Sequence, residues 1–291
     1  MKTHPFSEDA SHSVAPEPAQ PARLHVRLGQ IWPAGHFGRL GETIAFTWRR
    51  MWRAPVGQPE PVWSRQLVLL ALAGLVAVVL LLPFDATVMD FILSNRNQLM
   101  RWLASLSQTG KSEWYLVPAL LLYLVAATAD WRNAGHRVRA RLVVLFGQAS
   151  FLFSSVAITG IAVNLVKIVV GRARPSMFGE LGAYHFDPFV VSKYFSSFPS
   201  GHSTTLGTVA AVLMIWFPRQ WLPIGVVFLT LSSFRVPAAA HYPSDVVGGF
   251  MFGLVLTIAM ARFLAARRVA FRPRKGKLLP AATGIGRKKQ P

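Results

Sequence analysis

Long apolar runs separated by short polar segments dominate the pattern of the chain. The runs lack the polar stripe, recurring every 3.6 residues, that most helices of a soluble bundle carry. Several runs are only about 15 or 16 residues long, shorter than the ~20 residues that cross a 30 Å hydrocarbon core, so length alone also allows buried helices of a soluble protein. The number of runs and their lack of a polar face favour the membrane. The six segments lie at 66–83, 114–129, 142–166, 203–217, 221–240 and 246–264.

This pattern predicts an all-α integral membrane bundle of six helices over residues 66–264, with short helices in the outer loops. Residues 1–36 are rich in Pro, Ser and Ala, and we expect a disordered cytoplasmic leader. Residues 37–65 mix Trp and Phe with Arg, as in a basic helix lying along an anionic membrane surface. A poorly ordered basic linker is the equal alternative there, because the apolar residues form no single stripe. Residues 265–291 form a basic cytoplasmic tail.

The chain carries 31 Lys and Arg against 12 Asp and Glu, a net charge of +19 that by itself would suggest a nucleic-acid partner. Such a partner needs a continuous basic surface interleaved with aromatic side chains. Here the basic residues gather near the two ends and in one internal loop. With both termini inside, 23 of the 31 fall on the cytoplasmic side, as the positive-inside rule requires. The charge therefore orients the protein, and no nucleic acid is expected to bind.

The chain contains no cysteine, which excludes disulfides, thiol nucleophiles and thiolate metal sites. It also shows no internal repeat of the kind that marks an inverted-repeat transporter.

Three clusters of ionisable residues fall on the side of the membrane opposite the termini. An ionisable group costs about 2.5–3.5 kcal/mol or more at the bilayer centre, so such groups are functional candidates. Because all three clusters lie at one face, loops can gather them without moving a charge across the bilayer. The clusters are Lys167 and Arg174 in KIVVGRARP, Pro199 to His202 in PSGH, and Arg235, His241 and Asp245 in RVPAAAHYPSD.

Three cations without paired acids call for an anion, and a tetrahedral phosphate suits them. The two imidazoles indicate a reaction centre rather than a binding site alone. Lys167 and Arg174 lie about 10.5 Å apart along a continuous helix, too far to share one phosphate. We therefore expect Gly171 and Pro175 to end the helix and fold Arg174 back.

The other two clusters begin helices. Ser200 is a good N-cap, and Gly201 lets a phosphate approach the free amides at that helix start. Pro243 suits the first turn of the last helix. His241 and Asp245, four residues apart, can form a dyad in which the carboxylate orients the imidazole and stabilises its charged form.

The pattern K-x6-R-P, then P-S-G-H, then R-x5-H-x3-D resembles the three-part signature of the type-2 phosphatidic-acid phosphatase superfamily, which is related to glucose-6-phosphatase and the vanadium haloperoxidases. It runs from Lys167 to Asp245. One position departs from it: the family usually places Ser before the third-motif Arg, where this chain has Phe234. Phe234 has no hydroxyl, so one hydrogen bond that the family's Ser would make near the site is not expected in this chain.

The resemblance implies a phosphatase that uses no metal and no cofactor and works through a covalent phosphohistidine. His241 would attack phosphorus, Asp245 would orient it, and His202 would protonate the leaving oxygen and then activate water. The phosphoryl oxygens would be held by Lys167, Arg174 and Arg235 together with the amides near Ser200 and Gly201. Membrane members of the family act on lipid phosphates from the outer face, which implies a lipid phosphate as substrate, membrane lipids as neighbours, and a periplasmic site in a bacterial inner membrane.

Two other functions remain open from the sequence. A phosphotransferase would pass the same phosphoryl group to a sugar or lipid hydroxyl, and a non-catalytic anion transporter would use the same cations. The pair of histidines argues against the transporter, because binding phosphate needs only cations and amides. Undecaprenyl pyrophosphate, phosphatidylglycerophosphate, phosphatidate and a lipid A phosphate all present the same reacting group.

Overall fold

Helices make up most of the computed structural model, which describes residues 36–57, 60–130 and 133–284. The predicted leader therefore lies outside the described residues except at its last position. Within the described ranges the only sheet is a pair of two-residue antiparallel strands, so the all-α prediction is confirmed in its main feature. The elements are α1 His36–Met51, α2 Arg65–Leu81, η2 Leu82–Phe84, α3 Asp85–Ser94, α4 Gln98–Leu106, η3 Ser107–Gly110, α5 Glu113–Thr128, α6 His136–Val170, η4 Pro175–Met177, α7 Phe178–Leu181, α8 Gly201–Trp216, η5 Pro218–Gln220, α9 Trp221–Ser233, α10 Pro243–Ala266, β1 Phe271–Arg272 and β2 Ala281–Ala282.

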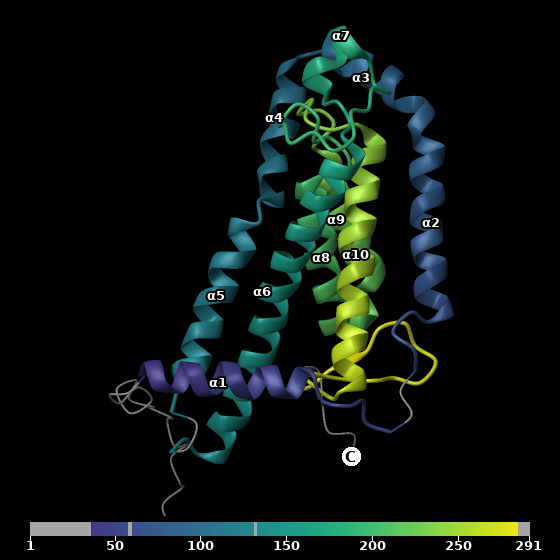
Figure 1. Ribbon diagram of the computed structural model, residues 1–291. Helices are drawn as coiled ribbons and strands as arrows, with labels where there is room; N and C mark the ends of the chain where they lie inside the picture. Colours follow the sequence, from purple (N-terminus) through teal and green to yellow (C-terminus); the bar gives the residue numbers. More distant parts are fainter. Residues whose placement is uncertain (1–35, 58–59, 131–132, 285–291) are drawn as a thin grey trace, which may run out of the picture.

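The helices α2, α5, α6, α8, α9 and α10 run roughly along one common axis (Figure 1). Each begins within one of the predicted apolar segments or a few residues before it. Within the described residues, three helical stretches are long and apolar enough to cross a membrane: Arg65–Ser94, α6 and α10. The helices α5, α8 and α9 have only 16, 16 and 13 residues. The chain is thus an integral membrane protein, and the count of six spans stays a prediction.

The centre of the bundle is the contact between α8 and α10. Helix α8 buries 12 of its 16 residues, which explains why a short helix is tolerated here. Two glycines allow the close approach: a Cβ added at Gly207 would lie 2.0 Å from the carbonyl oxygen of Phe250, and one at Gly253 would lie 2.1 Å from that of Thr204. Small residues at helix crossings serve this purpose in membrane bundles.

The two ends of the bundle differ. The short helices α3, α4 and α7 lie at one end, while α1 lies across the axis at the other end, close to the C-terminal segment (Figure 1). That the short helices belong to outer loops stays a prediction. Trp48 of α1 and Trp52, the residue after this helix, are exposed, and the last turn of α1 contains Arg49 and Arg50. Its contact with a membrane surface, expected from the sequence, stays a prediction.

The basic segment after α10 folds back against the bundle. Phe271 of β1 is fully buried, with its ring 4.6 Å from that of Phe151 in α6. The guanidinium of Arg262 donates to the backbone carbonyls of Val62 and Leu278, at 2.9 and 3.1 Å. Much of the predicted tail is therefore part of the packed fold.

Candidate active site

The end of α6 turns sharply and brings Arg174 back toward Lys167. Gly171 has a φ of +60°, in the left-handed region, and its N–H bonds the carbonyl of Lys167 at 2.8 Å. A Cβ at this position would lie 1.8 Å from the carbonyl oxygen of Asp187, so both the conformation and the close packing require glycine. Pro175 then opens η4. The predicted end of the helix is confirmed, and Lys167 and Arg174 lie close enough to interact electrostatically.

The start of α8 faces Lys167. Ser200 is the N-cap in an extended conformation, and its Oγ accepts from the amide of Ser203 at 3.4 Å, as predicted. A Cβ added at Gly201 would lie 3.3 Å from Lys167 Nζ. The ammonium group and the amide end of α8 therefore meet at one point, where an anion would be stabilised by both.

His241 and Asp245 lie at the start of α10. Pro243 is the first residue of the helix, and Asp245 Oδ2 accepts from the amide of Tyr242 at 2.9 Å. His241 Nδ1 lies 3.6 Å from the same oxygen, longer than a hydrogen bond but within reach of one after a small rotation. The predicted dyad is thus assembled in space.

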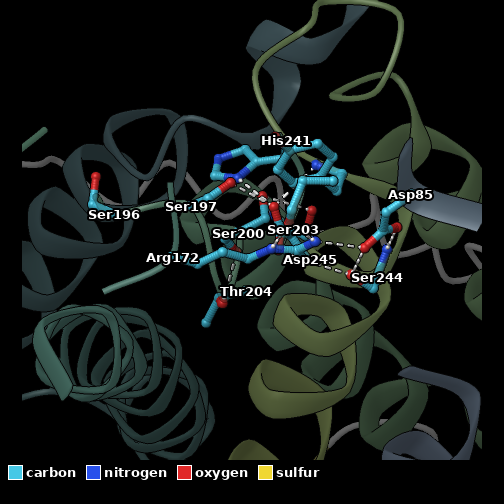
Figure 2. A network of polar contacts seen from close by, with 12 residues as sticks. Asp85, Arg172, Ser196, Ser197, Ser200, Ser203, Thr204, His241, Ser244 and Asp245 are labelled. Atoms are coloured by element: carbon cyan, nitrogen blue, oxygen red, sulfur yellow. Dashed lines mark hydrogen bonds and ion pairs between the residues drawn. The ribbon is translucent and has the colours of Figure 1, made fainter. Parts of the chain in front are cut away.

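A buried network that the sequence did not predict holds Asp245 in place (Figure 2). Arg172 Nη1 donates to Asp245 Oδ1 at 2.7 Å, and Arg172 Nη2 donates to Asp85 Oδ2 at 2.8 Å. Ser197 Oγ donates to Asp245 Oδ2 at 2.6 Å. Ser244 bonds Asp85 through both its amide and its hydroxyl. The carboxylate behind His241 is therefore fixed by three other parts of the chain.

The three cations among the predicted phosphate-binding residues make no ion pair in this network. Among the described residues, no ion pair joins Lys167, Arg174 or Arg235 to a carboxylate. In the described part of the chain, Arg174 Nε and Arg235 Nε are buried without a hydrogen-bond partner. Buried donors are almost always satisfied, so this concentration of unused donors suits a bound anion.

Arg235 is oriented by a residue that the sequence did not single out. Its Nη1 donates to Ser107 Oγ of η3 at 3.2 Å. The departure at Phe234 thus leaves Arg235 with a serine hydroxyl from elsewhere in the chain, while Phe234 caps the end of α9.

His202 occupies the first turn of α8. Gly110 of η3 packs against it: a Cβ there would lie 2.8 Å from that of His202. Arg235, His241 and Lys167 are close enough to act on the charge of His202. All eight predicted site residues are therefore gathered at the end of the bundle opposite α1.

His241 is only 2% exposed. Burial lowers the pKa of its imidazole to about 4; the carboxylate of Asp245 opposes this shift, and Arg235 and Arg174 add to it. The imidazole is therefore neutral near pH 7 and can act as a nucleophile. Among the described residues, no group of three or more His, Asp or Glu side chains could hold a metal ion.

Comparison with known proteins finds a matching family model and relatives that are named phosphatases. The model of the PAP2 superfamily matches residues 148–268. A lipid A 1-phosphatase of Rhizobium johnstonii is 32% identical over 219 residues, covering 74% of this chain and 87% of the relative. A lipid A 1-phosphatase of Rhizobium etli is 36% identical over 157 residues, covering 53% and 68%.

More distant matches also exist. An undecaprenyl-diphosphatase of Sulfolobus acidocaldarius is 28% identical over 105 residues, covering 34% of this chain and 50% of that protein. The crystal structure of a transmembrane PAP2 type phosphatidylglycerolphosphate phosphatase from Bacillus subtilis covers 67% of this chain and 93% of its own, at 20% identity and a TM-score of 0.41. The Rhizobium relationships confirm the resemblance: the chain belongs to the PAP2 superfamily and is a membrane phosphatase.

Proposed function

We propose that this protein is a metal-independent lipid phosphatase that works through a covalent phosphohistidine at His241. The observation that carries the proposal is a buried, neutral imidazole backed by a fixed carboxylate and placed near three cations that have no acidic partner. The cations and the amides at Ser200 and Gly201 would hold the phosphoryl oxygens. Such preorganised donors stabilise the charge that develops in the transition state.

In the first step, His241 Nε2 attacks phosphorus while the bond to the lipid oxygen breaks, and His202 gives its proton to that oxygen. Asp245 stabilises the positive charge on the phosphorylated imidazole. In the second step, neutral His202 takes a proton from water, whose oxygen attacks phosphorus. The phosphorus–nitrogen bond breaks, and inorganic phosphate and free His241 are released.

His202 must carry a proton in the first step, although burial of its imidazole, and then the nearby cations, oppose its protonation. A bound phosphate dianion offsets the effect of the cations, because its charge opposes that of Lys167 and Arg235 and favours the imidazolium. We infer that His202 gains its proton together with the substrate.

The substrate class follows from the relatives. Two of them are named lipid A 1-phosphatases, so we propose a phosphorylated glycolipid of the lipid A type as the preferred substrate, with undecaprenyl diphosphate as the next candidate. The site lies at the end opposite α1 and the basic segment. Together with the excess of Lys and Arg on the side of the termini, this supports a periplasmic active site and cytoplasmic termini in a bacterial inner membrane.

The test is phosphate release by the purified protein from lipid A, undecaprenyl diphosphate, phosphatidylglycerophosphate and phosphatidate. We expect lipid A to be the best substrate and His241→Ala to lose at least about 10³-fold in rate. His185→Ala, in an exposed loop, is the matched control. Rapid quenching with radiolabelled substrate should trap an acid-labile label on wild-type protein. Undiminished turnover in His241→Ala would remove the covalent assignment, and transfer of label to an added alcohol instead of water would identify a phosphotransferase.

A further inference from the structure

A large groove opens near the end of the bundle opposite the candidate active site. It has a volume of about 1210 Å³ and runs between α9, the last turns of α8, α10 and the segment from Arg272 to Gly284. Pockets for small ligands are typically about 300–1,000 Å³. None of the eight candidate site residues lines it, so it is a separate feature of the molecule.

The part of the groove between α9 and α10 is apolar. Leu222, Val226 and Leu229 of α9 line one side, and Leu254 and Ile258 of α10 line the other. The α9 residues are highly exposed, at 57%, 57% and 39%. In a bundle that spans a membrane this wall faces hydrocarbon, so its natural occupant carries acyl chains.

The part of the groove beside η5 and the segment after α10 is basic, and we call this part the mouth. Arg219, Arg272, Arg274 and Lys277 line it, all four exposed, and none of the described lining residues is acidic. The nearby carboxylate of Glu60 is already engaged, because it accepts from the amide of Gly276 at 2.7 Å and pairs with Arg262 at 3.4 Å.

Aromatic residues mark the level of this mouth. Trp216, Phe217 and Trp221 line the groove beside Arg219. Helix α1, with its exposed Trp48 and the exposed Trp52 directly after it, crosses the same end of the bundle (Figure 1). Trp is enriched where a membrane meets water. The cations therefore lie at headgroup level and the apolar wall at the level of the chains.

We propose that this groove binds an anionic phospholipid, with its acyl chains between α9 and α10 and its phosphate among Arg219, Arg272, Arg274 and Lys277. Charge complementarity favours an anionic headgroup. Four cations attract a lipid with net negative charge, whereas the ammonium of a zwitterionic headgroup would have no carboxylate among the described lining residues to pair with. Basic pockets between helices on the cytoplasmic side suit such lipids. The inference does not depend on the chemistry at His241.

The test is native mass spectrometry of the full-length protein after reconstitution with phosphatidylglycerol or phosphatidylcholine. We expect phosphatidylglycerol to be retained preferentially, and glycerol 1-phosphate, which lacks acyl chains, not to displace it. Each surface cation near an anionic headgroup contributes roughly fivefold in affinity. The Arg272→Gln/Arg274→Gln variant should therefore bind phosphatidylglycerol roughly 25-fold more weakly, whereas Arg268→Gln/Lys275→Gln, which changes two exposed cations outside the groove, should not.

The apolar wall is tested by filling it. Val226→Trp places a large ring in the groove, while Val227→Trp puts the same ring at the next position of α9, which does not line it. The two valines are similarly exposed, at 57% and 53%. Loss of bound lipid only in Val226→Trp supports the proposal. Equal retention in both members of either pair, or equal retention of phosphatidylcholine, would overturn it; unchanged phosphate release shows that the variants are folded.

Discussion

Arg172 donates from Nη1 to Asp245 Oδ1 at 2.7 Å, with both side chains completely buried. Its other terminal nitrogen holds Asp85 of α3. Arg174, two residues further on, makes no such pair and belongs to the cation cluster of the site. Neighbouring arginines of one motif thus have opposite roles: Arg172 positions the acid behind the proposed nucleophile, and Arg174 is free to meet a phosphate.

Asp85→Asn tests the positioning role. Removing this charge leaves Arg172 with one carboxylate, so Asp245 and His241 become less well held. We expect kcat to fall roughly ten- to a hundredfold with little change in KM, because small misplacements of reacting groups carry costs of this size. The uncompensated charge of Arg172 should also lower the pKa of His241 further, which moves the acid limb of the pH profile downward.

Asp90→Asn, on the exposed face of the same helix, is the control and should behave like wild type. Because breaking a buried ion pair costs about 3–5 kcal/mol, thermal unfolding should be recorded, and rates compared at a temperature where both variants are folded. Wild-type kcat and an unmoved acid limb in Asp85→Asn would contradict the role.

The pH dependence follows from the lowered pKa of His241, about 4 in the folded protein against about 6.5 for an ordinary histidine. The neutral imidazole is the nucleophile, so kcat/KM should hold down to about pH 5 and fall as pH drops through 4. Between pH 6.5 and 4 the unfolded chain binds more protons at this position than the folded chain. This residue therefore makes folding stability decrease as pH is lowered across that range. Steady-state rates and thermal unfolding between pH 3.5 and 8 measure both effects, and an acid limb centred near 6.5 would contradict the assignment.

Metal removal and vanadate test the chemistry of the site. We expect full phosphate release after treatment with a strong chelator, because the cations and amides of the protein itself hold the phosphoryl group. Vanadate should inhibit competitively, since it mimics the trigonal-bipyramidal transition state. Phosphate release should be measured with chelator, with added magnesium, and with increasing vanadate. A strict magnesium requirement would contradict the metal-free mechanism.

Local rules predicted the parts of the site that depend on neighbouring residues. The turn at Gly171, the N-cap at Ser200 and Pro243 at the first position of α10 all follow from backbone preferences within a few residues. The gathering of the three motifs was predicted from the charge asymmetry, which indicated that all three lie at one membrane face. Predicting these features required no knowledge of which helices contact one another.

The buried network could not be found in this way. Arg172 and Asp85 are 87 positions apart in the chain, and no periodicity relates them. The segment KIVVGRARP contains both Arg172 and Arg174, but their spacing does not predict which side chain pairs with the buried carboxylates. The packed segment after α10 was missed for the same reason, because its basic composition is typical of a solvated tail, whereas burial of Phe271 depends on a contact with the distant Phe151.

Gly201→Ala tests whether Lys167 and the start of α8 share one phosphate. The new methyl group would lie 3.3 Å from Lys167 Nζ, so the ammonium, at the end of a flexible side chain, must move away from the amides. We expect KM to rise several-fold with little change in thermal stability, because the fold itself meets no clash. Gly179→Ala is the matched control, since a Cβ there, in α7, has nothing within 4 Å. Steady-state kinetics on the best lipid substrate measure the effect, and an unchanged KM in Gly201→Ala would show that Lys167 and these amides do not bind the same group.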